Sequence, residues 1–208
     1  MQRGKTLPEP FRGDDWQEIR LDIDASVAPD YVADICNMAD VATASMDGIW
    51  SSHNLEHLYA HDVPRALSEF RRVLKPSGIV VIAVPDIQRV AQFVATGDLE
   101  GALYFSPAGP ISAIDMLYGH RASLARGNPF MAHQTAFTAD TLARHLIAAA
   151  FDNVNILREG FNLCAAAQRP ATESAAPHCQ YRVLDRNGPA PKVSAMPTNV
   201  SAANEANG

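Results

Sequence analysis

The segment IVVIAVP, residues 79–85, limits the possible folds more than any other part of the sequence. Every residue in it is apolar, and it lies between the turn residues of PSG, 76–78, and Asp86. A strand that is apolar on both faces is buried on both sides, like the strands of a parallel sheet between two layers of helices. The segment therefore predicts a central strand of an α/β sheet.

An amphipathic helix is expected to precede this strand, from Asp62 to Lys75. Asp62 is suited to the N-cap position, and Pro64 lies in the first turn, where proline is tolerated. The apolar residues of this segment recur at helical spacing and give the helix one apolar face: Val63, Leu67, Phe70 and Leu74. The proline and glycine of LKPSG then predict its end.

A second helix is expected over residues 139–150. Thr138 can cap it, and Phe137 can pack on Leu142 as a hydrophobic staple.

Further strands are expected on either side of the two helices. Short strand-like segments cover residues 16–24, 30–35 and 46–52, before the first helix. After the second helix, the segments 153–159 and 161–168 predict an antiparallel hairpin that closes one edge of the sheet. The alternation of strands and helices indicates the α/β class.

The middle of the chain gives weaker signals. Residues 86–97 read as a helix, and residues 97–105 and 110–119 as two shorter helices. Residues 120–134, HRASLARGNPFMAHQ, read as a loop.

The chain divides into three parts by composition. Residues 1–15 are polar and predict an irregular N-terminus, and residues 16–169 form the predicted domain. Residues 170–208 are rich in alanine, proline, serine and asparagine, which predicts a mostly disordered tail. Within that tail, residues 178–186 alone are expected to order locally.

Composition also excludes several classes of protein. The net charge is −6 and the basic residues form no stripe, which argues against a nucleic-acid interface. No segment approaches the about 18 consecutive apolar residues of a membrane span, and the N-terminus has no apolar signal region. The cysteines are odd in number and far apart, so neither a disulfide framework nor a cysteine zinc site is expected: Cys36, Cys164 and Cys179. A cytoplasmic protein is the resulting expectation.

Polar residues follow several of the predicted strands. Asp22, Asp34 and the run Ser51-Ser52-His53 each come where a strand is expected to end. In open α/β sheets, ligands bind beyond the carboxyl ends of the strands. One carboxylate there can accept both hydroxyl hydrogen bonds of a ribose, and a second can accept from an adenine amine. A single aspartate at a strand end is ordinarily a turn former or helix cap, so the set is more informative than its members.

Several segments of the sequence together resemble a known family. The segments RLDID, SSHNLEHL and RVLKPSG, in this order, resemble the class I S-adenosylmethionine-dependent methyltransferases over roughly residues 16–168. FTADTLARHLIAAAFDNV resembles the late helix and following strand of that family. The resemblance implies a Rossmann-like methyltransferase sheet and S-adenosylmethionine as the cofactor.

The resemblance also implies roles for residues near the cofactor. Asp22 would bind the ribose hydroxyls and Ile23 would pack on the adenine. Asp34, with the backbone of Ile35, would read the adenine edge. The residues beside the methionine part of the cofactor would be Ser51, Ser52 and His53.

One departure from the family affects its first strand. The family begins with an apolar strand and a glycine-rich loop about 20 residues before the ribose carboxylate. Here 21 residues precede Asp22, with Gly4 and Gly13 but no apolar strand and no glycine cluster. The first strand of the sheet is therefore expected to be missing. Either the sequence is an N-terminally truncated form or it is a degenerate relative that has lost cofactor binding, and the presence of Asp22 and Asp34 favours truncation.

The histidines of SSHNLEHLYAHD allow a different hypothesis. His53, Glu56 and His57 fit the H-x-x-E-H spelling of a zinc protease, which requires them on a helix. Because GIWSS reads as a strand, His53 is expected at a strand tip instead, and no metal site is expected. His57 then reads as structural and His61 as solvated. His53 can serve as a general base, since an imidazole can take up a proton at neutral pH, or it can merely line the cleft.

The middle segment carries the candidates for acceptor binding: Tyr118, His120, Arg121 and His133. The alternative is that Tyr118 is a core aromatic and His133 caps a turn. The resulting hypothesis is methyl transfer from S-adenosylmethionine to a small-molecule or glycan-type acceptor, with no nucleic acid or membrane as partner. Two alternatives stay open, namely a non-catalytic module of the methyltransferase fold and a zinc-dependent hydrolase acting through His53 and His57.

Overall fold

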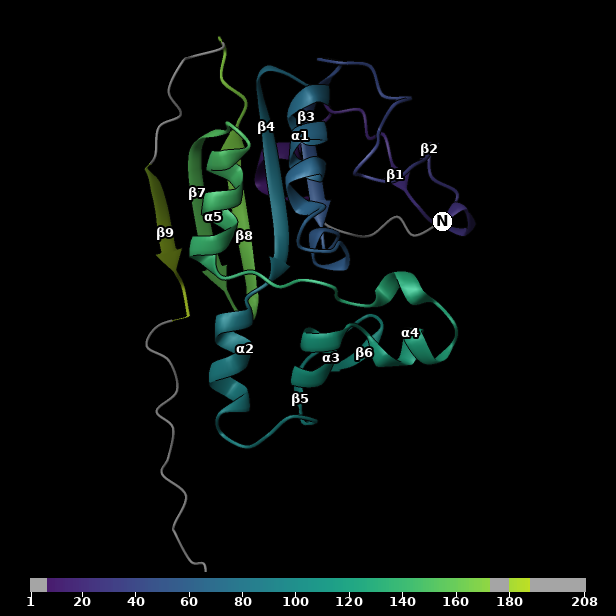
Figure 1. Ribbon diagram of the computed structural model, residues 1–208, viewed down its shortest axis with the longest axis vertical. Helices are drawn as coiled ribbons and strands as arrows, with labels where there is room; N and C mark the ends of the chain where they lie inside the picture. Colours follow the sequence, from purple (N-terminus) through teal and green to yellow (C-terminus); the bar gives the residue numbers. More distant parts are fainter. Residues whose placement is uncertain (1–6, 173–179, 188–208) are drawn as a thin grey trace, which may run out of the picture.

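A mixed sheet of five strands forms the centre of the protein (Figure 1). The computed structural model describes residues 7–172 and 180–187. The strands follow the order β3-β4-β8-β7-β9 across the sheet. Their bounds are Met46–Ser52 for β3, Leu74–Pro85 for β4, Asp152–Glu159 for β7, Asn162–Gln168 for β8 and Tyr181–Asp185 for β9. The α/β class expected from the sequence is confirmed.

Strand β4 is the central strand that IVVIAVP predicted. It pairs in parallel with β3, for example Trp50 with Val81, and antiparallel with β8, for example Ile82 with Ala165. Leu74, Val80, Ile82 and Val84 are buried in the main hydrophobic core. Val81 is also buried, whereas Ile79 and Ala83 are half-buried. The parallel pair matters for function, because the carboxyl ends of β3 and β4 meet at one edge of the sheet.

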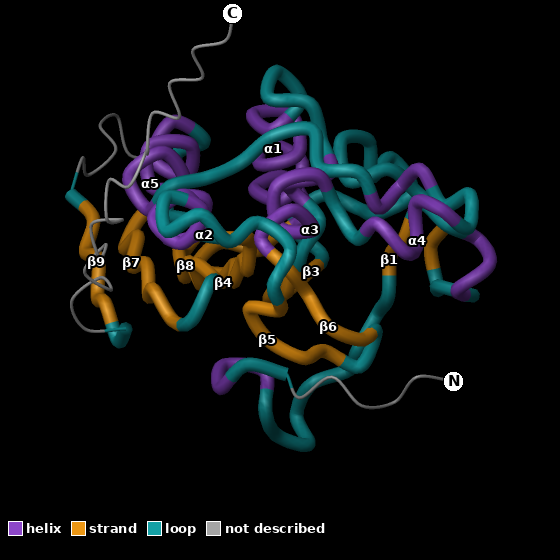
Figure 2. Tube along the Cα trace, turned by 90° about the horizontal axis from the view of Figure 1, so that it is seen from below, coloured by secondary structure: helices purple, strands orange, loops and turns teal. Residues whose placement is uncertain are grey.

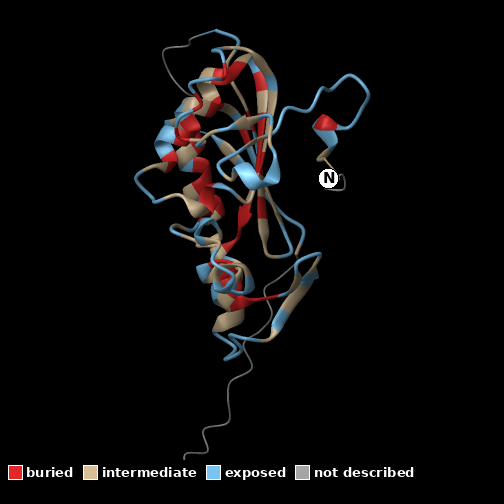
Figure 3. Ribbon diagram, turned by 90° about the vertical axis from the view of Figure 1, so that its right-hand side faces the viewer, coloured by how far each residue is buried: buried red, intermediate tan, exposed pale blue. Residues whose placement is uncertain are grey.

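Two helices cover one face of this sheet. Helix α1, Val63–Val73, and helix α5, Ala139–Ala148, pack side by side over the core strands (Figure 2). The N-terminal segment lies on the side of the sheet away from these helices (Figure 3). There, Phe11 and Trp16 lie against Gly48 of β3, where an added Cβ would be 2.4 Å from the Phe11 ring. No helix in the described ranges is long and apolar enough to cross a membrane.

Helix α1 agrees with its prediction except at its two ends. All four residues of the predicted apolar face are buried. Asp62 occupies the N-cap position, but its side chain makes no capping hydrogen bond. The helix ends at Val73, as LKPSG predicted, but β4 begins directly at Leu74, which pairs with Met46. A register shift between Met46 and Gly48 accommodates the intervening residues.

Helix α5 and the hairpin after it also follow their predictions. Thr138 accepts a hydrogen bond from the Thr141 backbone N–H at 3.2 Å, and both staple residues are buried. Strands β7 and β8 pair antiparallel. The hairpin does not close the edge of the sheet, however, because β9 pairs in parallel with β7 and becomes the outer strand. The predicted disordered tail lies largely outside the described residues, as do residues 1–6 of the predicted irregular N-terminus.

The middle of the chain differs most from expectation. Helix α2, Ile87–Val94, is confirmed, but the helix predicted over 97–105 is wrong, because β5, Ala102–Ser106, pairs with β6, Gly109–Ser112. Only the later part of the helix predicted over 110–119 forms, as α3, Ala113–Tyr118. The predicted loop contains the short helix α4, Arg121–Ala125, and the 3-10 turn η4, Pro129–Met131. Pairing across β5 and β6 places Tyr104 and Ile111 in a second apolar cluster with α2 and α3, so packing overrides the local helix signal.

Candidate functional site

Two short strands carry the carboxylates expected to bind the cofactor. Strand β1, Leu21–Asp22, pairs in parallel with β2, Tyr31–Val32, and Asp22 lies opposite Val32. The backbone N–H of Ala33 donates to the Asp22 carbonyl at 3.1 Å. Both strands are shorter than predicted. Asp34 follows β2 two residues after its end, so both aspartates lie at the carboxyl ends of neighbouring parallel strands.

Each carboxylate makes one local hydrogen bond. Asp22 Oδ1 accepts from the Asp24 backbone N–H at 2.9 Å, and Asp34 Oδ1 accepts from the Cys36 backbone N–H at 2.7 Å. Both aspartates are exposed. An ionised carboxylate offers about four acceptor positions, so these turn bonds leave capacity for a ligand. The pair therefore fits the hydroxyl and amine donors of an adenosine moiety.

The thiol of Cys36, two residues after Asp34, has low reactivity. Burial and the nearby Asp34 carboxylate raise the pKa of Cys36 to about 12. At neutral pH Cys36 is therefore a protonated, weakly nucleophilic thiol.

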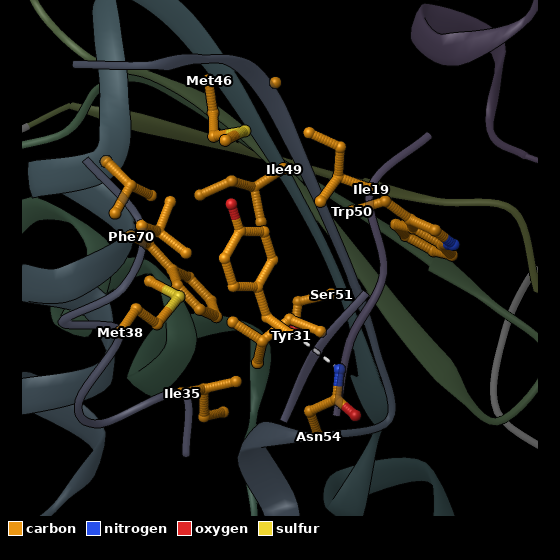
Figure 4. Close-up of a pocket in the computed structure, with 14 residues that line it drawn as sticks. Ile19, Tyr31, Ile35, Met38, Met46, Ile49, Trp50, Ser51, Asn54 and Phe70 are labelled. Atoms are coloured by element: carbon orange, nitrogen blue, oxygen red, sulfur yellow. Dashed lines mark hydrogen bonds between the residues drawn. The ribbon is translucent and has the colours of Figure 1, made fainter. Parts of the chain in front are cut away.

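An apolar cavity of about 150 Å³ separates these two strands from β3 (Figure 4). Figure 4 shows Ile35 and Asn54, which follow β2 and β3, at one end of the cavity, and Met46 from the start of β3 at the other. Residues that follow β2 and β3 thus lie at the same end of the cavity. Enclosed ligand pockets have about 300–1,000 Å³, so a cofactor here would extend over the strand ends.

Among the described residues, β3 is the edge strand of the five-stranded sheet on the side of the cavity, and β1 and β2 form a separate pair. No strand of the described part lies hydrogen-bonded between β3 and β1.

The other residues expected near the cofactor lie at the end of β3 or directly after β1 and β3. Ile23 is exposed directly after β1. Ser51 is buried, and its Oγ accepts a hydrogen bond from Asn54 Nδ2 at 3.2 Å, drawn in Figure 4. Ser52 is half-buried at the end of β3. The backbone N–H of His53 donates to the Ala83 carbonyl of β4 at 2.8 Å. Of the residues predicted to contact the cofactor, Ile35 and Ser51 line the cavity between β2 and β3.

The SSHNLEHL segment does not form the helix that a zinc protease motif requires. His53 follows β3 with a φ of 56°, and Leu55–His57 form the 3-10 turn η3. His53 Nδ1 lies 2.9 Å from Glu56 Oε1, and Glu56 is only 1% exposed. His61 is exposed and stacks on Tyr59, as expected of a solvated residue. The hydrolase hypothesis through His53 and His57 therefore lacks its helical framework.

His133 joins this segment from a distant part of the chain. Its Nδ1 lies 2.9 Å from the Met116 carbonyl, and its ring contacts that of His57 with centroids 5.0 Å apart. The backbone N–H groups of Gln134 and Thr135 donate to the Glu56 carbonyl at 2.8 and 3.2 Å. Burial lowers the pKa of His133, although the nearby Glu56 carboxylate opposes this shift. At neutral pH its imidazole is therefore uncharged.

The remaining residues proposed for acceptor binding have other contacts. Tyr118 is exposed at the end of α3, and His120 Nδ1 lies 2.8 Å from Ser123 Oγ. Arg121 Nε donates to the buried carboxylate of Asp115 at 3.0 Å. Burial disfavours the ionised Asp115, but hydrogen bonds from Arg121 and Ser112 outweigh it and lower the pKa of Asp115. Arg121 therefore connects α4 to α3. Of the four residues proposed for acceptor binding, only His133 lies against Glu56 and His57.

Glu56 is the residue whose environment the sequence did not reveal. Its position in LEHL reads as one polar residue in a short turn. Its neighbour His133 is 77 positions later in the sequence, and only the tertiary fold brings the two side chains together.

Comparisons with known proteins bear on the first part of the domain. Residues 16–82 match the family model of a methyltransferase domain. No curated protein has a matching sequence. Similar solved structures include an O-methyltransferase family protein from Burkholderia thailandensis, at 12% identity and a TM-score of 0.45, over 69% of this chain and 36% of that one. A SAM-dependent methyltransferase from Archaeoglobus fulgidus has 14% identity and a TM-score of 0.49, over 71% of this chain and 74% of that one.

A third similar structure has ligands bound. It is the 1,6-didemethyltoxoflavin-N1-methyltransferase of Burkholderia thailandensis with 1,6-didemethyltoxoflavin and S-adenosylhomocysteine, at 18% identity and a TM-score of 0.42, over 72% of this chain and 60% of that one. The chain spans only 36% and 44% of the length of the first two structures found. The family model confirms the resemblance noted in the sequence over residues 16–82, a segment that contains Asp22, Asp34 and the Ser51-Ser52-His53 run.

Proposed function

We propose that this chain binds S-adenosylmethionine across the carboxyl ends of β1, β2 and β3 and transfers its methyl group to a small-molecule or glycan-type acceptor. The observation that carries the proposal is the pair Asp22 and Asp34, exposed carboxylates at the ends of two paired parallel strands. Both lie within the residues that match the methyltransferase family.

The residues at these strand ends suit the parts of the cofactor. Asp22 accepts hydrogen bonds from the ribose hydroxyls, and the exposed side chain of Ile23 covers one face of the adenine. Asp34 accepts a hydrogen bond from the adenine amine, and the backbone of Ile35 contacts the same edge of the adenine ring. The end of β3, at Ser52 and His53, lies beside the methionine part.

Bound S-adenosylmethionine supplies a methyl group that its sulfonium charge activates for in-line displacement. The protein then contributes mainly by positioning donor and acceptor. Where the acceptor is a hydroxyl, His53 is placed to take its proton. Glu56 binds Nδ1 of this imidazole at 2.9 Å, which leaves Nε2 as the basic nitrogen.

The acceptor is proposed to lie near the segment that contains β5, β6, α3 and α4. Figure 1 shows this segment beyond the carboxyl end of β4. Tyr118, His120 and His133 contribute aromatic and hydrogen-bonding groups from it, and Arg121 adds a charge that Asp115 holds in place. Such groups recognise hydroxyl-rich or small polar acceptors.

Titration of the purified protein with S-adenosylhomocysteine by isothermal calorimetry tests the cofactor proposal. We expect micromolar binding, and a loss of roughly 10- to 150-fold in affinity for Asp22→Ala, since one hydrogen bond to a charged group contributes about 1.5–3 kcal/mol. Asp40→Ala is the matched control, because Asp40 is an exposed carboxylate later in the same segment and lies outside the strand ends. Its affinity should equal that of the unmodified protein.

Two outcomes would contradict the proposal. Absence of binding at millimolar S-adenosylhomocysteine to a folded protein would favour the alternative of a non-catalytic module. Equal affinity of the Asp22→Ala and unmodified proteins would place the cofactor elsewhere.

A further inference from the structure

A buried carboxylate oxygen without a partner lies beside the candidate cofactor site. Glu56 is 1% exposed, and while Oε1 meets His53, Oε2 has no hydrogen bond among the described residues. An unsatisfied buried polar atom costs about 1–3 kcal/mol, and more for a charged group. The position of Oε2 therefore calls for a cationic or hydrogen-bonding partner.

Two imidazoles face this carboxylate. One ligand atom each from Glu56, His57 and His133 can be chosen so that all lie within 4.8 Å of one another. His57 and His133 are both half-buried, and their ring centroids are 5.0 Å apart. The three side chains thus converge on one point from two segments of the chain.

Backbone carbonyls hold both rings in the orientation typical of metal ligands. His57 Nδ1 lies 3.0 Å from the Ala132 carbonyl, and His133 Nδ1 lies 2.9 Å from the Met116 carbonyl. Each carbonyl accepts only from a protonated Nδ1, which leaves the lone pair of Nε2 available on both rings. Metal-binding histidines donate their other ring N–H in the same way, which fixes the tautomer and the ring.

We propose that Glu56, His57 and His133 form a binding site for a divalent transition-metal ion of the zinc class. Two imidazoles and one carboxylate are a ligand set of zinc sites that keep an open fourth position. Zinc binds these ligands at about 2.0–2.2 Å, so tetrahedral coordination places ligand atoms roughly 3.3–3.6 Å apart. Ligand atoms within 4.8 Å of one another reach this spacing with small side-chain rotations.

This site differs from the H-x-x-E-H motif. In that motif His53 is a ligand, whereas here His53 binds the far oxygen of Glu56 and supports the carboxylate. The third ligand is His133, which the motif does not contain. The site links η3 to the segment before α5, where Gln134 and Thr135 already donate to the Glu56 carbonyl. It shares Glu56 and His133 with the residues proposed for the methyl-transfer site, but it makes no use of Asp22 or Asp34, so metal binding can be measured without the cofactor.

The proposal is tested by titrating zinc chloride into untagged full-length protein that has been stripped with a chelator. We expect one ion per chain by calorimetry and elemental analysis. His57→Ala and His133→Ala should each weaken binding by more than about 10- to 100-fold, the loss seen when even an outer partner of a metal ligand is removed. His61→Ala is the matched control, since this histidine is near in sequence but exposed and outside the cluster. It should bind zinc like the unmodified protein.

Two further measurements guard against misfolded variants. Glu56→Gln keeps the size of the side chain and its contact with His53 but removes the charge, and it should also lose zinc affinity. Cobalt(II) added to the unmodified protein should give the visible absorption of a tetrahedral nitrogen–oxygen site, and His133→Ala should abolish that absorption.

The proposal is overturned by absence of stoichiometric zinc binding to the folded protein. It is equally overturned by affinity that is unchanged in both histidine variants and in Glu56→Gln. Binding of S-adenosylhomocysteine, measured separately, distinguishes failure of this site from failure of the proposed function.

Discussion

Replacing Asp86 with alanine is expected to lower the free energy of unfolding by about 3–5 kcal/mol, the cost of breaking a buried ion pair. The Asp86 side chain is 0% exposed at the end of β4. Its Oδ2 accepts from Arg158 Nε at 2.8 Å and Nη2 at 2.7 Å. Its Oδ1 accepts from the Gln88 and Arg89 backbone N–H groups and caps α2. The variant leaves the Arg158 guanidinium without its buried partner and removes the cap in one step.

Urea unfolding followed by circular dichroism measures this change. The matched control is Asp47→Ala, which removes the exposed ion pair of Asp47 and Lys75, 2.8 Å apart. Exposed pairs contribute about 0–1 kcal/mol, so this control should unfold near the midpoint of the unmodified protein. Equal destabilisation by the two variants would show that the buried pair has no special importance.

Phe137→Ala is expected to have a similar effect, about 3–5 kcal/mol, because it opens a large cavity in the core. Phe137 is 1% exposed, belongs to the main hydrophobic core and lies edge-on to His145, with centroids 6.0 Å apart. Its carbonyl also accepts from the Ile87 backbone N–H at 3.1 Å, which joins the start of α5 to the start of α2.

The matched control for this substitution is Phe105→Ala. Phe105 is 81% exposed on β5, so its truncation should change the free energy of unfolding by no more than about 0.5 kcal/mol. Phe137→Leu is a milder variant for measurement if the alanine variant does not fold. A Phe137→Ala protein that unfolds at the same urea concentration as the control would contradict the assigned core.

The sequence predicts the parts of the fold in which side-chain periodicity reports burial. The apolar face of α1, the central strand β4 and the hairpin of β7 and β8 are examples. It fails at β5, where residues 97–105 read as a helix. Pairing with β6 and packing on α2 decide that segment, and both depend on residues distant in the chain.

The roles of the aspartates at the strand ends could not be predicted from the sequence either. Asp22, Asp34 and Asp86 all lie at or just after the end of a strand, and their position in the sequence does not tell their roles apart. In the structure, Asp86 is buried and serves as a cap and ion-pair partner, whereas Asp22 and Asp34 remain exposed. The neighbours of a carboxylate decide between these roles. The meeting of Glu56 with His133 was beyond prediction for the same reason.

A crystal structure of the protein with S-adenosylhomocysteine tests the central claim most directly. The account predicts the ribose hydroxyls within about 3.2 Å of the Asp22 carboxylate, with the adenine between Ile23 and Asp34. A nucleoside bound on another face, with Asp22 and Asp34 both in contact with solvent only, would contradict it.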